Sequence, residues 1–142
     1  MKKLTTTFLL AIFLITACSK KDKTASKSEL LTSGTWKITG SDEDGDGNGS
    51  YEIDNYAFFP DCFKDNYFTF HASGILEMNE GPTKCDAADP QTVTGNWQLT
   101  QNETHIKIDT DEWKLEELTA TTIRWKEEYM GGGSARVTFT KR

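Results

Sequence analysis

From residue 34 to its end, the chain alternates apolar and polar side chains in short runs that turn residues separate. The clearest run is TVTGNWQLT (92–100), in which Val93, Trp97 and Leu99 alternate with polar residues. Because successive side chains of a strand point to opposite faces, this pattern predicts a strand with one apolar face. Seven further runs show the same alternation: 34–40, 66–72, 75–79, 105–108, 112–118, 121–130 and 135–140.

The alternation also predicts which side chains face the interior. Segments such as QNET, DTDE, TAT and GGGS separate the runs and are typical turn sequences. A single helical turn near 26–33 is the only helix that the sequence predicts. The predicted inward set is Trp36, Ile38, Phe68, Phe70, Val93, Gly95, Trp97, Leu99, Ile106, Ile108, Trp113, Leu115, Ile123, Trp125, Tyr129, Val137 and Phe139.

Eight strands with mostly short connections favour antiparallel neighbours, because parallel strands need long crossovers. An up-and-down barrel leaves no sheet edge exposed, whereas a two-sheet sandwich is an alternative that the pattern leaves open. About 110 residues follow the N-terminal segments, which is enough for one core. We therefore predict an all-β fold over 30–142: an eight-stranded antiparallel up-and-down barrel, preceded by a short helical turn.

Residues 1–17 predict a signal peptide. Lys2 and Lys3 precede the apolar run LTTTFLLAIFLITA (4–17), which is too short for a comfortable transmembrane helix. The small residues before Cys18 resemble the lipobox of bacterial lipoproteins, which implies cleavage before Cys18 and attachment of lipid, such as palmitate, to it. An ordinary secretory signal is the alternative. The polar sequence that follows predicts a flexible tether over 18–29.

The N-terminal segment also bears on the localisation of the protein and on the net charge of the mature chain. Ser19 follows Cys18, which by resemblance to enteric lipoproteins favours the outer membrane. Removal of the signal peptide, with its two lysines, leaves 14 basic and 22 acidic side chains, so the surface does not favour nucleic acid. We expect a monomer in the cell envelope whose membrane contact is the lipid on Cys18.

Cys62 and Cys85 are the cysteines of the predicted domain. In an oxidising compartment two cysteines predict a disulfide, and free thiols are the alternative. The bond would close a loop of 24 residues, for which the chain-entropy model gives about 3–4 kcal/mol. His71 and His105 have no spacing to the cysteines that would indicate a zinc site.

Several short motifs occur in an order that resembles a known family. They are Gly34-Thr35-Trp36, CFKDNYFTF (62–70), Cys85, Gly95-Asn96-Trp97 and RVTFTKR (136–142). The first resembles the G-x-W signature of the lipocalin barrel, and the set is similar to lipocalin-like domains of lipoproteins in Gram-negative bacteria. The resemblance covers about 30–142. It implies a barrel that binds a small apolar or glycan-like molecule, and an arginine, Arg124 or Arg136, packed over Trp36.

Ligand contacts are predicted from aromatic residues near the barrel mouth. Phe58, Phe59 and Phe63 crowd a segment without strand pattern, where they either plug the barrel or form a lip on its mouth. A barrel filled by its own side chains, acting as a structural or interaction module of the envelope, is the alternative. The residues predicted to contact a ligand are Tyr56, Phe58, Phe59, Trp97, Trp113 and Trp125.

Catalytic motifs do not stand out in this sequence. No Ser-His-Asp or Cys-His arrangement, phosphate-binding glycine loop or H-E-x-x-H motif can be identified. Adjacent carboxylates such as Glu116 and Glu117 point to opposite faces of a strand and do not converge. We do not expect an enzyme.

The segment DGDGNGSYEID (44–54) has half of a calcium-binding pattern. Counted from Asp44 with EF-hand spacing, oxygen ligands fall at Asp44, Asp46, Asn48 and Glu52, with glycine at the sixth position. The twelfth position is Asn55, where a bidentate glutamate belongs. The segment predicts either a solvated loop at the barrel rim or a weak calcium site with a Kd of about 10⁻⁴–10⁻³ M.

Overall fold

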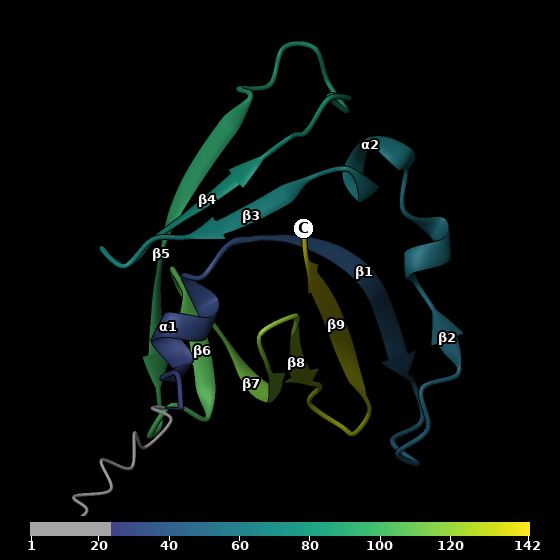
Figure 1. Cartoon of the computed structure of the whole chain (residues 1–142). Helices are drawn as coiled ribbons and strands as arrows, with labels where there is room; N and C mark the ends of the chain where they lie inside the picture. Colours follow the sequence, from purple (N-terminus) through teal and green to yellow (C-terminus); the bar gives the residue numbers. More distant parts are fainter. Residues whose placement is uncertain (1–23) are drawn as a thin grey trace, which may run out of the picture.

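The computed structural model describes residues 24–142, so the signal peptide, Cys18 and most of the tether lie outside the described part. The nine strands form one antiparallel sheet in the order β2-β1-β3-β4-β5-β6-β7-β8-β9, and β1 also pairs with β9 (Figure 1). The sheet therefore closes into a ring, which confirms the up-and-down arrangement and leaves no place for a two-sheet sandwich. The strands are β1 (Thr35–Asp44), β2 (Ile53–Asp54), β3 (Tyr67–Phe70), β4 (Ile75–Asn79), β5 (Thr92–Thr100), β6 (His105–Ile108), β7 (Asp111–Leu118), β8 (Thr122–Glu128) and β9 (Ser134–Lys141).

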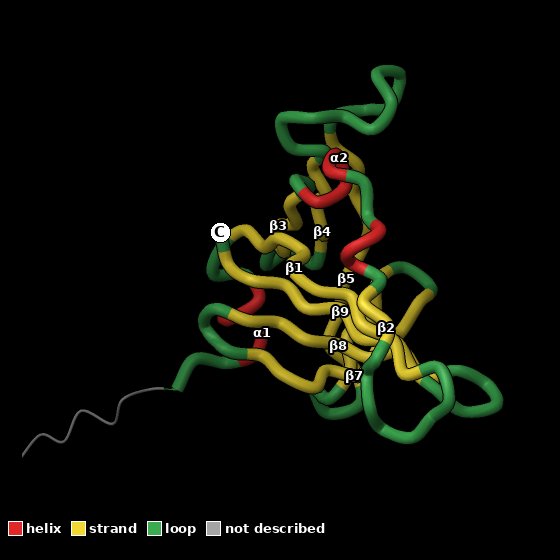
Figure 2. Tube along the Cα trace, turned by 90° about the vertical axis from the view of Figure 1, so that its right-hand side faces the viewer, coloured by secondary structure: helices red, strands yellow, loops and turns green. Residues whose placement is uncertain are grey.

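All eight predicted strands are present, and the ring closes mainly between β1 and β9. Their pairing runs from Trp36 opposite Lys141 to Asp44 opposite Ser134, and Figure 2 shows β1, β9, β8 and β7 side by side. β1 and β3 pair at only two positions, near the start of β1. Further along β1, where it no longer pairs with β3, β2 and two short helices run beside β1 towards β3 (Figure 1). The helices are η1 (Tyr56–Phe58) and α2 (Asp61–Lys64). The prediction of a single helix is wrong in this segment.

One end of the ring is closed by α1 (Lys27–Leu31). Ser26 begins the helix with a capping box, since its hydroxyl accepts the Glu29 N–H and the Glu29 carboxylate accepts the Ser26 N–H. Leu31 is fully buried, and its carbonyl accepts the indole N–H of Trp36 at 2.8 Å. The predicted helical turn is confirmed, and it begins within the last residues of the predicted tether. Within residues 24–142, no helix is both long and apolar enough to cross a bilayer.

The cation over Trp36 is a lysine. Nζ of Lys141 lies 6.0 Å from the indole ring centre. Arg124 instead forms an ion pair on the outer face of β8, and the Arg136 guanidinium lies 3.6 Å from the ring centre of Tyr51. The expectation of an arginine on Trp36 is therefore wrong. Both arginines alternate with inward-facing core residues on their strands, so they point outward.

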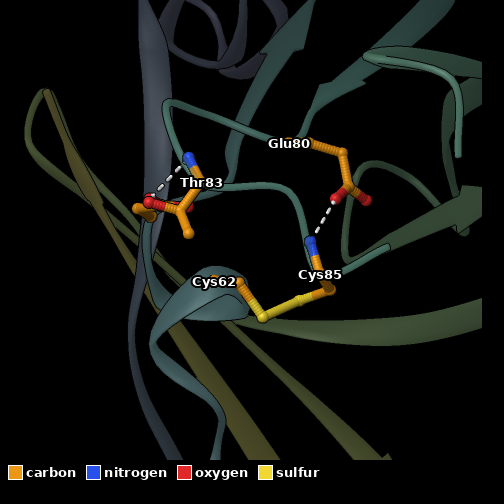
Figure 3. The surroundings of a disulfide bond; sticks show 5 residues. Cys62, Glu80, Thr83 and Cys85 are labelled. Atoms are coloured by element: carbon orange, nitrogen blue, oxygen red, sulfur yellow. Dashed lines mark hydrogen bonds between the residues drawn. A yellow bond between two sulfur atoms is a disulfide. The ribbon is translucent and has the colours of Figure 1, made fainter. Parts of the chain in front are cut away.

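The predicted disulfide between Cys62 and Cys85 is confirmed, with 5.1 Å between the Cα atoms (Figure 3). It joins α2 to the connection 80–91 between β4 and β5. Among the hydrogen bonds that hold this connection, Cys85 N–H donates to Glu80 and Thr83 N–H donates to Asp65, each at 3.1 Å. The bond therefore anchors α2 beside the end of the β3–β4 hairpin.

The core occupies the closed end of the ring. Most of the predicted inward side chains are buried or half-buried, but Val93 and Tyr129 are 41% and 38% exposed. Tyr129 lies just beyond β8, and Val93 lies near the start of β5, so both belong to the open end. The buried core consists of Leu31, Trp36, Ile38, Phe70, Leu76, Trp97, Ile106, Ile123, Trp125 and Phe139.

Candidate functional site

The interior of the ring contains a cavity of about 510 Å³ above the core. Side chains from α2 and from every strand except β2 line it. Its polar lining side chains are Thr94, Asp109 and Glu127, and the rest of the lining is apolar. This volume lies within the range of ligand sites, about 300–1,000 Å³, which are mainly apolar with a few polar groups.

Four aromatic rings form a continuous wall of this cavity. Phe68 meets Phe139 edge to face at 5.4 Å, and Phe139 lies 4.3 Å from Trp125. Trp125 stacks on Trp113 with 5.6 Å between ring centres and 19° between planes. Phe139 and Trp125 are buried, whereas Trp113 is half-buried. The wall therefore offers flat apolar surface from the core towards solvent. Of the predicted ligand contacts, Trp113 and Trp125 lie here.

Trp97 does not line the cavity. Its indole N–H donates to the carbonyl of His71 at 3.0 Å, and its ring packs edge-on against Phe70 at 5.5 Å. Trp97 is only 8% exposed. It belongs to the core at the closed end, because β5 runs from the open end towards this end and Trp97 lies in its second half.

The aromatic segment before the disulfide borders the cavity through one member. Phe63, next to Cys62 on α2, lines the cavity and is 36% exposed. Phe59 packs edge to face on Phe63 at 5.2 Å, and Tyr56 packs on Phe59 at 5.7 Å. Tyr56 and Phe59 therefore pack behind Phe63 without lining the cavity. Phe58 does not line it either and is 83% exposed.

The lining residues that the predicted contacts omit are mostly aliphatic or carry charge. They belong to the inward alternation, so the signal for them was in the sequence. Glu127 shows this best, because it continues the face of Ile123 and Trp125 by two further residues. These additional lining residues include Ile38, Phe68, Met78, Val93, Glu127 and Val137.

Asp109 is fixed at the edge of the cavity by the bend of β5. The first half of β5 pairs with β4 and its second half pairs with β6. At the change of partner, the Asp109 carboxylate accepts the Asn96 N–H at 2.9 Å, and the Asp109 N–H donates to the Asn96 carbonyl at 2.8 Å. A Cβ on Gly95 would lie 2.6 Å from Oδ2 of Asp109. A side chain at this position would therefore displace the Asp109 carboxylate, so glycine favours this close approach.

The acidic loop after β1 is organised around Asp44. This residue is only 3% exposed, and its carboxylate accepts backbone N–H groups from Gly47, Asn48 and Gly49 at 2.8, 3.2 and 3.0 Å. Desolvation by burial acts to raise the pKa of Asp44, but the hydrogen bonds from Gly49, Gly47 and Asn48, with one involving Asp46, lower the pKa below its usual value.

Three of the four predicted calcium ligands converge in this loop. Carboxylate oxygens of Asp44, Asp46 and Glu52 lie within 4.8 Å of one another. The Asn48 side chain presents its amide nitrogen to this group, donating to Asp46 at 3.0 Å and to Glu52 at 3.4 Å. Its oxygen instead accepts the Ser50 N–H at 2.7 Å. A cation would need the Asn48 amide to turn.

Comparison with sequence families identifies the domain. Residues 32–125, about two thirds of the chain, match a family described as the lipocalin-like domain. The chain belongs to this lipocalin-like family. The matched part runs from just before the G-x-W motif to the aromatic wall, so it includes most of the cavity lining.

The solved structures support the lipocalin-like fold. A DUF4847 family protein from Bacteroides vulgatus ATCC 8482, solved as a crystal structure at 1.00 Å resolution, aligns with a TM-score of 0.54 and 14% sequence identity. The alignment covers 82% of this chain and 98% of the Bacteroides protein. At this identity the likeness concerns the fold alone. A comparison with curated proteins finds no significant match.

Proposed function

We propose that this lipocalin-like protein binds a small, mainly apolar molecule in the cavity of the ring. The cavity of about 510 Å³, with its wall of four aromatic rings, is the observation that carries this proposal. Burial of apolar ligand surface against these rings supplies the driving force, about 25 cal/mol for each Å² removed from water. The proposal is a monomeric binding protein without catalytic activity.

Binding can be tested with N-phenylnaphthylamine, an uncharged dye that fluoresces in apolar surroundings. We expect saturable binding to the wild-type domain, because a flat apolar molecule can pack along Trp113 and Trp125. Val93→Trp places a large ring in the cavity and should weaken binding about tenfold or more. Gln98→Trp is the matched control, since Gln98 lies exposed on the opposite face of the same strand. Absence of saturable binding to a folded wild-type domain would contradict the proposal.

A second test needs no assumption about the ligand. The domain purified from its own host and examined by native mass spectrometry should retain a small molecule that Val93→Trp does not retain. Consistently ligand-free wild-type protein that also fails to bind the dye would favour the alternative, an interaction module. That alternative is supported by the exposure of Phe58 and Met130, which lie in connections between strands.

We propose further that Cys18 carries lipid that holds the domain in the cell envelope, at the outer membrane. The basic start, the apolar run and the small residues before Cys18 support this. An alkyne analogue of palmitate should label the wild-type protein in a Gram-negative host, and Cys18→Ala should abolish the label. The Cys18→Ala protein should also move from the membrane fraction to the soluble fraction. Equal labelling of both proteins would rule out this anchor.

A further inference from the structure

Two carboxylates face inward beyond the aromatic wall. Glu127 follows Trp125 by two residues on β8, so it lies on the cavity face, and it contributes to the lining. Ala135 on β9 is opposite Glu127 on one side and opposite Glu43 of β1 on the other. Directly opposite residues of antiparallel strands share a face of the sheet. Glu43 therefore faces inward in the same row as Glu127.

The residue between the two carboxylates is small. Neighbouring strands lie about 4.8 Å apart, so the backbones of Glu43 and Glu127 are separated by about 10 Å. Only the methyl group of Ala135 stands between them on this face. Two glutamate side chains of this length can approach one group from both sides.

Neither carboxylate has a cationic partner within the described chain. Glu43 accepts a hydrogen bond from the Asn55 amide at 2.9 Å, and Glu127 forms no hydrogen bond or ion pair among residues 24–142. The basic residues beside this row point outward. Lys126 pairs with Glu128 at 3.4 Å, and Arg136 pairs with an acidic residue of β1 at 3.3 Å.

Tyr129, two residues after Glu127, interacts electrostatically with both carboxylates. Burial raises the pKa of Tyr129, and the negative charges of Glu43 and Glu127 raise it further. Tyr129 is thus within electrostatic range of both carboxylates, which agrees with the strand register. An aromatic face near a pair of carboxylates favours a positively charged group over a neutral one.

We propose that the ligand carries a positively charged amine on a flat apolar body. The body lies along Trp113 and Trp125, and the ammonium group lies between Glu43 and Glu127. This inference rests on the proposed binding function of the cavity and adds the charge of the ligand. Asp109, the remaining carboxylate of the lining, is engaged by the backbone of Asn96 and has a structural role.

Three naphthalene probes of similar size separate charge from apolar contact: naphthylethylamine, naphthylethanol and naphthylacetate. Their dissociation constants can be measured by quenching of tryptophan fluorescence and by calorimetry at neutral pH. We expect the amine to bind about tenfold more tightly than the alcohol, and the acid to bind most weakly. The preference for the amine should decrease as salt is added, because salt screens the partly exposed carboxylates.

Matched variants assign this preference to the two glutamates. Glu127→Gln and Glu43→Gln keep side-chain size, and each should lower the ratio of amine to alcohol affinity severalfold, with the double variant bringing it near one. Glu128→Gln, one residue further along and on the outer face, should keep the wild-type ratio. Equal affinity of the wild-type domain for amine and alcohol, or an unchanged ratio in the double variant, would overturn the inference while leaving the binding function in place. Failure of all three probes to bind would overturn the binding function itself.

Discussion

Gly95 illustrates how one residue sets the shape of the cavity edge. A Cβ at this position would lie 2.6 Å from the Asp109 carboxylate, which holds the backbone of Asn96 at the bend of β5. We predict that Gly95→Ala destabilises the domain by about 1–3 kcal/mol, as other overpacked sites do. Urea denaturation measures this value. Thr94→Ala, an exposed neighbour on the same strand, should change stability by less than about 0.5 kcal/mol. Similar midpoints for both variants would show that Asp109 moves without cost.

Asp44 gives the stability of the domain an acid-dependent component. Its folded pKa is lower than its unfolded value near 3.8, so protonation favours the unfolded state. The contribution is complete above the unfolded pKa and is lost as the pH falls through the lower folded pKa. Asp44→Asn should therefore be less stable than wild type at pH 7, and the difference should shrink below about pH 3.8. Urea unfolding at several pH values measures this, with exposed Asp89→Asn as the control. A difference independent of pH would contradict the assignment.

Some of the individual residues of the cavity wall could be predicted from the sequence. Alternation placed Trp113 and Trp125 on the inner face, and both line the cavity. The same alternation contained Glu127, but a charged residue does not stand out as an inward position until its partners are known. The sequence placed Phe63 in a lip or plug of the barrel. It did not identify Phe63 as a ligand contact, because the position of this residue depends on the disulfide.

The position of α2 depends on the disulfide bond. The Cys62–Cys85 bond joins α2 to the connection 80–91, and the adjacent Phe63 lines the cavity. We predict that the double variant Cys62→Ser/Cys85→Ser loses about 3 kcal/mol of unfolding free energy, by the loop-entropy argument. Dye binding should weaken as well, because Phe63 is no longer held over the cavity. Wild-type affinity in a destabilised double variant would show that Phe63 does not contribute to the site.

The loop from Asp44 to Glu52 supports a prediction about calcium. Oδ2 of Asp44 accepts a single backbone N–H, so it retains capacity for a cation. With a Kd of about 10⁻⁴–10⁻³ M, 10 mM calcium would stabilise the domain by about 1.4–2.7 kcal/mol. Thermal melting in calcium and in chelator should therefore differ by several degrees for wild type. Magnesium at the same concentration controls for ionic strength, and Glu52→Gln should reduce the shift. Identical wild-type melting curves in calcium and in chelator would show that the loop does not bind calcium.

The elements that the sequence did not predict share a physical cause. β2, η1 and α2 have no alternation of period two and are short, so local pattern carries little information about them. Pairing of Ile53 and Asp54 with β1, ring contacts of Phe59 and the disulfide determine their positions, and all of these are contacts between distant parts of the chain. The eight longer strands were predicted because apolar residues alternate with polar residues within each of them, which identifies the buried face locally.

In the whole molecule, the first helix and the cavity lie towards opposite ends of the ring. α1 packs beneath Trp36, and the C-terminal Arg142 donates its N–H to the Thr35 carbonyl at the same end. The register places Glu127, Glu43 and the turn after β6 towards the other end. If lipid on Cys18 holds the chain near a membrane, an orientation with the closed end towards that surface directs the cavity away from it. The ligand then enters from the aqueous side, and a nearby membrane does not obstruct it.

This orientation can be tested by attaching the domain to vesicles at either end. A histidine tag before Thr24 fixes the closed end to chelating lipid, and Thr110→Cys, in the turn after β6, fixes the open end to maleimide lipid. We predict that the tag-anchored domain binds naphthylethanol with the rate and affinity of the free domain. Attachment through Thr110→Cys should slow association at least severalfold, because the membrane then covers the route into the cavity. Thr110→Cys capped with a small thiol reagent and left in solution controls for the substitution. Equal rates in both orientations would mean that the ligand enters elsewhere, through the weakly paired side of the ring between β1 and β3.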